Sequence, residues 1–306
     1  WILISYLIFL FINAKNKNKN LFSGFCVILM VTLLSSFIKD KKQTIYSPYQ
    51  NISVQHLTTP LNPIIIQTSH LFYQALLNLS KDLNYELQDK VEGNIFGQHV
   101  DVEHEREFYN LPYLINPTLP DKVMIVGSGA GNDVAAANRF NINRIDAVEI
   151  DPVIADLGKK YHPEEPYSKI NVNLFIDDAR SFIKNNKTQY NVIVYGLLDS
   201  QTNLSSKGGI RLDSYVYTIE AFKEAKKILE DDGIMFLSFF VQSPELGFKI
   251  FKMLEKVFGY KPLVLKSEIN DRYIFISKND INLKLSTENL KFFKKVKFFD
   301  SNENFK

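Results

Sequence analysis

The sequence is poor in cysteine and carries little excess charge. Its single cysteine, Cys26, excludes an intrachain disulfide and fits a reducing compartment. Lys and Arg total 36 against 34 Asp and Glu, so the net charge is only +2, and the lysines are dispersed along the chain. We therefore expect no nucleic-acid partner. No internal repeat is found, and a hydrophobic content of 45% is ample for one large or two small globular domains.

Residues 123–133, with the sequence VMIVGSGAGND, follow the pattern of a buried strand, a glycine turn and the start of a helix. Gly127, Gly129 and Gly131 let the backbone turn tightly against a ligand. The third glycine of a dinucleotide site is absent, because Asn132 occupies its position. The spacing Gly-x-Gly-x-Gly instead resembles the class I S-adenosylmethionine-binding fold.

A carboxylate follows this turn at a distance typical of ribose binding. The next predicted strand, Ile145 to Ile150, delivers Glu149 about 20 residues after the turn, where a carboxylate can accept both ribose hydroxyls. A tight bend without a ligand is the alternative interpretation of the glycines. Turn, helix, strand and acid in register favour a nucleoside-binding half-site over a bend alone.

Helices and strands are predicted to alternate along the rest of the chain. The predicted helices are Pro152–His162, Ala179–Lys184, Thr218–Leu229 and Pro244–Phe258, and the predicted strands are Asn171–Ile176, Val192–Leu198, Gly233–Phe239, Leu263–Ser267 and Tyr273–Ser277. This order predicts an α/β fold with a mainly parallel sheet and an antiparallel edge. Ligands of such sheets lie outside the carboxyl ends of the strands, which here carry Glu149, Asp178 and Asp199.

The segment before this fold is predicted to be a small β-rich domain, residues 43–118, followed by a catalytic domain, residues 119–306. Strand-like pieces are broken by Pro48, Pro60 and Pro63, as expected for edge strands and turns. Leu71 to Leu79 has helical spacing and is predicted to be a helix.

Residues 1–42 are predicted to be a truncated membrane segment of one or two helices. Leu21 to Ile38 carries no charge and approaches the roughly 20 residues that a bilayer-spanning helix needs. Trp1 to Ile12 is a second uncharged run, expected to be the remainder of a longer helix. A buried helix is the alternative for Leu21 to Ile38. Lysines flank both of its ends and give no orientation, but a nucleoside donor argues for a catalytic domain facing the cytoplasm.

Several motifs together resemble the spermidine and spermine synthases, the polyamine aminopropyltransferases. The motifs are VMIVGSGAGND, AVEIDPVI, DDARSF, YNVIVYGLLDS and YTIEAFKEAKKILEDDGI, with a looser match upstream through YSPYQNI, FYQ and EFYNLPYLINPTLPDKV. The resemblance covers most of residues 43 to 240 and implies a Rossmann-like class I S-adenosylmethionine-dependent methyltransferase fold behind a small N-terminal β-domain. Membrane-fused members occur in that family.

The resemblance also implies a donor and a set of binding residues. The donor would be decarboxylated S-adenosylmethionine, or S-adenosylmethionine itself, with a small amine as acceptor and no metal. Glu149 would hold the ribose and Asp178 the adenine amino group. The other positions that it implies are Gln50, Gly127, Gly129, Gly131 and Ala179 for the cofactor, and Gln74 and Ser200 for the substrate. The sequence leaves the oligomeric state open, a homodimer included.

Two carboxylates that the family usually carries are missing. Ala130 stands where the family has the aspartate that helps bind the cationic end of the ligands. Aligned without gaps, Gly196 falls on the aspartate proposed to deprotonate the amine, and Asp199 on a second aspartate. An alkylammonium with a pKa near 10 must lose a proton before it attacks, so we expect Asp199 to act as base or cation anchor.

His104 is the alternative base, because it lies near the position of the family's active-site tyrosine and an unperturbed histidine titrates near working pH. An exposed loop histidine is the other interpretation. His99, Asp101 and His104 lack a fourth ligand, so no metal site is predicted.

Three functions remain open on the sequence, in this order. The first is aminopropyl transfer to a diamine such as putrescine in polyamine biosynthesis. The second is methyl transfer on the same fold, favoured by Ala130. The third is a noncatalytic nucleoside-binding domain coupled to a membrane module.

Overall fold

The computed structural model describes residues 29, 42–56, 64–68, 71–81, 101–197, 215–241, 243–269, 272–278, 283–286, 288 and 290–296. The chain divides into two compact units, residues 1–43 and 44–306. The predicted membrane run, Leu21 to Ile38, lies outside the described residues except for Leu29. A search of the described residues finds no helix with the length and apolar character that crossing a bilayer requires. The predicted domain boundary at residues 118 and 119 stays a prediction.

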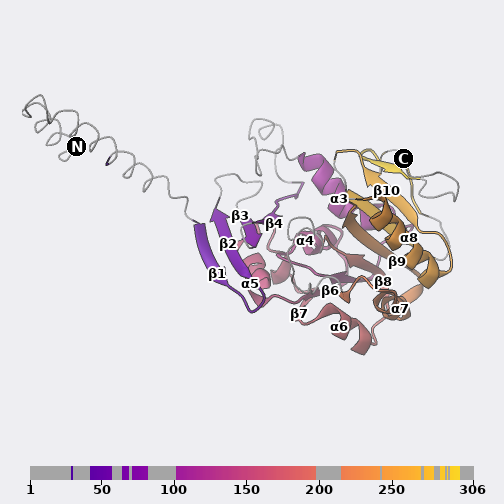
Figure 1. Cartoon of the computed structure of the whole chain (residues 1–306), viewed down its shortest axis with the longest axis horizontal. Helices are drawn as coiled ribbons and strands as arrows, with labels where there is room; N and C mark the ends of the chain where they lie inside the picture. Colours follow the sequence, from indigo (N-terminus) through magenta and orange to yellow (C-terminus); the bar gives the residue numbers. More distant parts are fainter. Residues whose placement is uncertain are drawn as a thin grey trace, which may run out of the picture. The chain divides into compact units, whose positions relative to one another are not determined.

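An eight-stranded sheet forms the centre of the second unit (Figure 1). Its order is β12 (Phe293–Lys295), β10 (Leu263–Ser267), β11 (Arg272–Ser277), β9 (Leu229–Phe240), β8 (Tyr190–Tyr195), β5 (Lys122–Val126), β6 (Arg144–Glu149) and β7 (Val172–Ile176). Strands β5 to β9 are parallel, and β11, β10 and β12 are antiparallel. The predicted parallel sheet with an antiparallel edge is thereby confirmed.

Side chains of β5 alternate between two cores on opposite faces of this sheet. Val123 and Ile125 pack with α3 (Val102–Leu114) and α4 (Asn132–Arg139). Met124 and Val126 belong to a second cluster with α6 (Ala179–Asn185), α7 (Ile219–Lys227) and α8 (Pro244–Phe258). Because successive strand residues point to opposite faces, an uninterrupted apolar run is what a strand covered on both faces needs.

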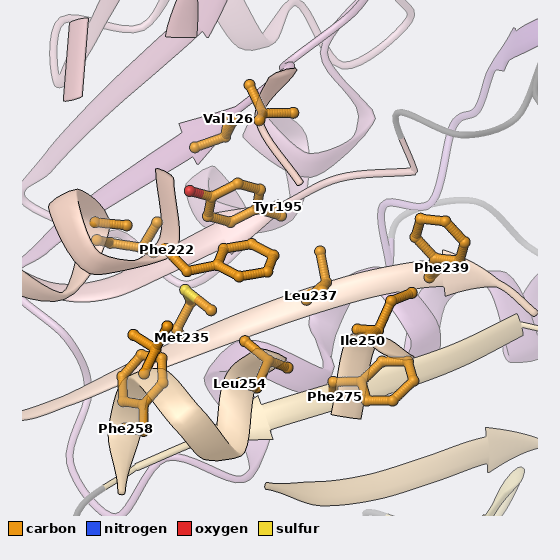
Figure 2. Close-up of a cluster of buried hydrophobic side chains, with 14 of the residues drawn as sticks. Val126, Tyr195, Phe222, Met235, Leu237, Phe239, Ile250, Leu254, Phe258 and Phe275 are labelled. Atoms are coloured by element: carbon orange, nitrogen blue, oxygen red, sulfur yellow. The ribbon is translucent and has the colours of Figure 1, made fainter. Parts of the chain in front are cut away.

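In the second cluster, the apolar faces of the predicted amphipathic helices α7 and α8 pack against the sheet. In Figure 2, Phe222 of α7 and Leu254 of α8 lie over Met235 and Leu237 of β9. Helix α8 has the bounds that the sequence predicts, because Ser243 caps its first turn and Gly259, with φ 87°, ends it in a left-handed conformation.

A separate four-stranded sheet precedes this fold, in the order β1 (Lys42–Tyr46), β2 (Asn51–His56), β3 (Ile64–Thr68) and β4 (Leu71–Leu76). The predicted small β-domain is therefore present in outline. The helix predicted over Leu71 to Leu79 is wrong, because Leu71–Leu76 form β4 and pair antiparallel with β3, and the next three residues are not helical. Their spacing suits either element, and pairing with the neighbouring strand decides between them.

Apolar side chains of this small sheet pack on helix α5 (Pro152–Tyr161). Ile52, Ile64 and Leu76 share one buried cluster with Ile154 and Leu157 of α5. Helix α5 begins directly after β6, so this packing brings the small sheet to the carboxyl edge of the large one.

Candidate functional site

The glycine turn between β5 and α4 has the conformation that only glycine adopts readily. Gly127, Gly129 and Gly131 have φ values of 67°, 56° and 107°. The Ser128 amide donates to the Val148 carbonyl at 2.9 Å, which fixes the turn against the neighbouring strand β6. The predicted tight turn is confirmed.

Glu149 ends β6 with its carboxylate already at this turn. Its Oε2 accepts a hydrogen bond from the Gly129 amide at 2.8 Å, and its Oε1 accepts one from the Asp151 amide at 2.9 Å. The side chain is buried, and burial raises the pKa of the Glu149 carboxyl to about 7 although both amides act to lower it. A carboxylate held in this way is positioned to accept hydroxyls from a ligand at the turn.

Gln74 reaches the turn from strand β4 of the small sheet. Its Oε1 accepts a hydrogen bond from the Ala130 amide at 2.9 Å. A Cβ on Gly129 would lie 2.8 Å from the same oxygen, so the close approach of Gln74 depends on that glycine. The sequence proposes Gln74 only through a loose resemblance, and the structure brings it to the glycine turn.

Gln50 is held at the same edge through Asp151. Its Nε2 donates to Asp151 Oδ2 at 3.3 Å, and the Ser47 hydroxyl donates to the same oxygen at 2.7 Å. The other carboxylate oxygen of Asp151 caps α5 by accepting from the Val153 amide. Asp151 therefore links the turn between β1 and β2 to the start of α5. Local sequence does not indicate this role.

Asp178 and Ala179 follow strand β7 at the same edge of the sheet. Asp178 caps α6 by accepting from the Ser181 amide at 2.8 Å. The neighbouring Asp177 amide donates to the Glu149 carbonyl at 3.1 Å, which ties this loop to β6. Because β5, β6 and β7 are parallel neighbours, all three of their carboxyl ends contribute to the site.

Two further contacts to the turn were not predicted from the sequence. The Tyr167 hydroxyl, from η2 (Pro166–Ser168), donates to the Gly129 carbonyl at 2.7 Å. Burial raises the pKa of Tyr167 above its ordinary value, so the hydroxyl keeps its proton. On α5, a Cβ at Gly158 would lie 2.4 Å from the Ala130 carbonyl oxygen, so the helix can approach the turn only with glycine there.

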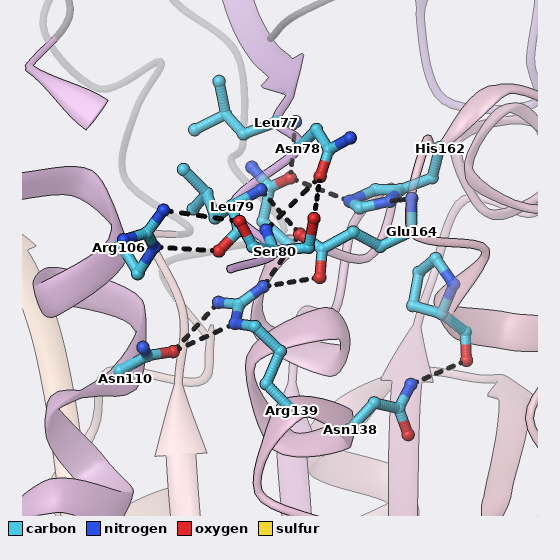
Figure 3. A network of polar contacts seen from close by, with 12 residues as sticks. Leu77, Asn78, Leu79, Ser80, Arg106, Asn110, Asn138, Arg139, His162 and Glu164 are labelled. Atoms are coloured by element: carbon cyan, nitrogen blue, oxygen red, sulfur yellow. Dashed lines mark hydrogen bonds and ion pairs between the residues drawn. The ribbon is translucent and has the colours of Figure 1, made fainter. Parts of the chain in front are cut away.

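A buried polar network joins the small sheet to helix α4 (Figure 3). Asn132 Oδ1 accepts from the Leu77 amide at 3.1 Å, and its Nδ2 donates to the Ala75 carbonyl at 2.9 Å. Burial lowers the pKa of His162 to about 3, so its neutral ring donates from Nε2 to Asn132 Oδ1. Asn132, the residue that excludes a dinucleotide motif, is thus a structural link between the small sheet and helix α4.

The same network contains a charged pair about two turns further along α4. Arg139 donates through Nη1 to Glu164, with both distances at 2.8 Å, and Glu164 Oε1 accepts from the Leu79 amide at 2.7 Å (Figure 3). Asn110 of α3 accepts from the same guanidinium. These contacts hold the segment that follows β4 against α4. They thereby help to position Gln74 on the same strand.

His104 does not lie in a loop, as the sequence suggested, but in helix α3, where it is 1% exposed. Its Nε2 is 2.9 Å from the Ser267 hydroxyl on β10, and its Nδ1 is 3.3 Å from an Arg272 nitrogen on β11. Asp101 caps this helix by accepting from the His104 amide. The side chain of His104 therefore has partners at the antiparallel edge of the sheet, and its role as a base stays a prediction.

Asp199, Ser200 and His99 lie outside the described residues. Strand β8 ends at Tyr195, and Gly196 follows with its amide donating to the Val126 carbonyl at 3.2 Å. The roles expected for Asp199 and Ser200 stay predictions.

The chain matches the spermine/spermidine synthase domain over residues 104–260, just over half of its length. The chain belongs to this family. Among curated relatives, it is 26% identical to the polyamine aminopropyltransferase of Korarchaeum cryptofilum over 164 residues, which cover 49% of this chain and 48% of that protein. It is 29% identical to the Clostridium botulinum polyamine aminopropyltransferase over 129 residues, 41% and 42% of the two chains. The chain thus spans about half the length of the curated relatives it matches.

Solved structures of the family share the fold. A spermidine synthase in complex with the transition-state analogue AdoDATO aligns with a TM-score of 0.57 and 16% identity, covering 86% of this chain and 81% of that one. The spermidine synthase from Thermotoga maritima aligns with a TM-score of 0.55 and 15% identity, covering 86% and 80%. The Rossmann-like fold with a small N-terminal sheet is therefore that of the spermine/spermidine synthase family.

Proposed function

We propose that the chain transfers an aminopropyl group from decarboxylated S-adenosylmethionine to a diamine such as putrescine. Membership of the family supports this function. The observation that carries it is the hydrogen bond from the Gly129 amide to Glu149, which holds a carboxylate at the glycine turn. In this proposal Glu149 accepts the ribose hydroxyls, Asp178 and Ala179 bind adenine, and Gln50 and Gln74 line the donor and substrate cleft.

The reaction requires a deprotonated amine. An alkylammonium with a pKa near 10 has no free electron pair at neutral pH, so it must first give up a proton. The amine nitrogen then bonds to the aminopropyl carbon next to the sulfonium. The carbon–sulfur bond breaks, its electron pair stays on sulfur, and methylthioadenosine leaves. The protein must hold the donor, orient the amine and accept the proton.

A direct test incubates the purified chain with decarboxylated S-adenosylmethionine or S-adenosylmethionine and a panel of amines. We expect methylthioadenosine from the decarboxylated donor with a diamine. Release of S-adenosylhomocysteine instead would replace the proposal by methyl transfer. If neither product forms with any pair of donor and amine, but the chain still binds methylthioadenosine, the third function, nucleoside binding without catalysis, would replace the proposal.

Methyl transfer is the second candidate because of Ala130. Ala130 is fully buried, and its amide and carbonyl face Gln74 and Gly158. No carboxylate side chain exists at this position to bind the amino end of an aminopropyl donor, so a feature that would favour the decarboxylated donor over S-adenosylmethionine is missing. The product assay above separates the two candidates.

We also propose that Leu21 to Ile38 attaches the chain to a membrane, with the catalytic domain facing the cytoplasm. The uncharged run supports this attachment. The full chain should then stay in the membrane fraction after alkaline carbonate extraction, whereas a chain that begins at Gln43 should be released. Recovery of the full chain in the soluble fraction would contradict the proposal.

A further inference from the structure

Asp133 places a carboxylate beside the end of strand β8. It lies in the first turn of α4, directly after the glycine turn. A Cβ on Gly196 would be 3.2 Å from Asp133 Oδ2 and 3.3 Å from the Gly127 carbonyl oxygen. The carboxylate therefore occupies the space into which a side chain at position 196 would extend, where the carboxyl ends of β5 and β8 meet.

The surroundings of this carboxylate leave its charge poorly compensated. Burial raises the pKa of Asp133 to about 7, against the lowering effects of its own backbone N–H and of Arg139 on the same helix. Within the described part of the chain, we find no side chain that donates a hydrogen bond to it. Asp133 nevertheless remains partly exposed, so a ligand can reach it. Enclosing a carboxylate without a partner is unfavourable unless the group takes up a proton or a cation binds it.

A helix-dipole role would not require this placement. Acidic residues in a first helical turn stabilise a helix by interaction with its positive end, and they do so at the surface. Glu245 in the first turn of α8 is an exposed example. Asp133 instead lies between two strand ends, at the sheet edge outside which ligands of this fold bind.

We propose that Asp133 binds the ammonium group of the acceptor amine and takes up its proton when the amine attacks. This inference rests on the proposed aminopropyl transfer. The ammonium gives its proton to the carboxylate, the freed nitrogen pair forms the carbon–nitrogen bond, and the carbon–sulfur pair returns to the sulfonium sulfur. The products are methylthioadenosine and a protonated secondary amine, and the proton on Asp133 then passes to water.

Gly196 is the second part of this arrangement. A side chain at position 196 would press on the carboxylate, because even a Cβ would approach Asp133 Oδ2 to 3.2 Å. In this chain the carboxylate comes from α4. Gly196, which follows β8, has no side chain and leaves room for that carboxylate. Replacement of Gly196 by alanine should therefore disturb amine binding without touching Glu149 or the ribose that it holds.

Amine binding tests the assignment without relying on turnover. Calorimetry measures putrescine and spermidine binding to the full chain saturated with methylthioadenosine. For Asp133→Asn we expect amine affinity to fall by about tenfold or more, on the scale of a lost bond to a charged group. Methylthioadenosine affinity should change by less than about threefold, because the nucleoside contacts are elsewhere. Gly196→Ala should show a smaller loss in amine affinity, and Glu245→Gln, which removes an exposed first-turn carboxylate, should show none.

Thermal unfolding separates this role from a structural one. The folded-state pKa of Asp133 is raised, so its charge destabilises the fold increasingly as the pH rises from about 4 to about 7. The other groups that interact with this carboxylate are Arg139 and the hydroxyls of Tyr109, Tyr113 and Tyr167, which stay neutral because their own pKa values are raised. Asp133→Asn should therefore unfold at a higher temperature than the wild type at pH 8, and the difference should shrink at pH 5.

The outcomes distinguish this inference from the proposed function. Unchanged amine affinity in Asp133→Asn, or a wild-type chain that binds no amine, overturns the assignment of Asp133. A lower unfolding temperature for the variant at pH 8 would overturn it in favour of a structural carboxylate. If the wild type binds amines through Asp133 but releases no methylthioadenosine from the decarboxylated donor, aminopropyl transfer fails while the amine site stands.

Discussion

Two parts of the sheet edge are built in different ways. The proposed nucleoside half, at the ends of β5, β6 and β7, takes Glu149 and Asp178 from one continuous stretch of chain. The proposed acceptor half combines Asp133 of α4 with Gly196 after β8, two segments far apart in the sequence. The glycine turn and Glu149 can therefore be predicted from spacing, whereas the adenine role of Asp178 is what the family resemblance implies. The acceptor half becomes visible only when the parallel strands bring its residues together.

The largest effect should come from the acceptor half. Asp199→Asn removes a second negative charge expected to anchor the cationic amine beside Asp133, and we expect turnover to fall by roughly a hundredfold or more. Donor affinity should change by less than about threefold. Steady-state kinetics and calorimetry measure the two quantities. Near-normal turnover would make Asp199 a turn residue and would mean that Asp133 holds the amine without it.

The link between the small sheet and helix α4 should affect stability more than chemistry. Asn132→Ala leaves the Leu77 amide, the Ala75 carbonyl and the His162 ring without this partner inside the protein. We expect the free energy of unfolding to fall by about 2 kcal/mol, as for other buried polar groups left unpaired. Chemical denaturation measures this change. The exposed Asn143→Ala is the control. Equal stability of the two variants would contradict a structural role for Asn132.

Loss of the ribose carboxylate should weaken the nucleoside half selectively. Glu149→Ala removes hydrogen bonds to a charged group, each worth about 1.5 to 3 kcal/mol, so methylthioadenosine should bind at least about tenfold more weakly. Asp156→Ala on exposed α5 surface is the matched control. Asp151 would be a poor control, because it caps α5 and holds Gln50. Unchanged calorimetric affinity in Glu149→Ala would remove the ribose assignment.

The pH dependence of nucleoside binding should be the smallest effect. The pKa of Glu149 is raised to about 7 in the unliganded chain, and only the ionised carboxylate can accept from both ribose hydroxyls. Affinity for methylthioadenosine should therefore rise between pH 6 and pH 8, by at most about tenfold, as the group loses its proton. A calorimetric titration series at several pH values checks this. An affinity that falls over this range would contradict the carboxylate role.

Where the sequence prediction failed, neighbouring elements decided the structure. The stretch from Leu71 has apolar residues at helical spacing, yet antiparallel pairing with β3 makes it strand β4 and brings Gln74 to the glycine turn. Helix α3 was not predicted, because its polar residues and the internal Pro112 weaken the helical pattern. His104 then looked like a loop residue, although packing against β10 and β11 buries it.

The sequence by itself determined the glycine turn, the position of Glu149 and the alternation of helices and strands. These features depend on backbone freedom at glycine and on short-range periodicity, which neighbouring residues set. Only the tertiary structure decided that Gln74 reaches the Ala130 amide and that Asp133 lies beside Gly196. Such contacts follow from strand order and from the packing of the small sheet on α5, so no local pattern specifies them.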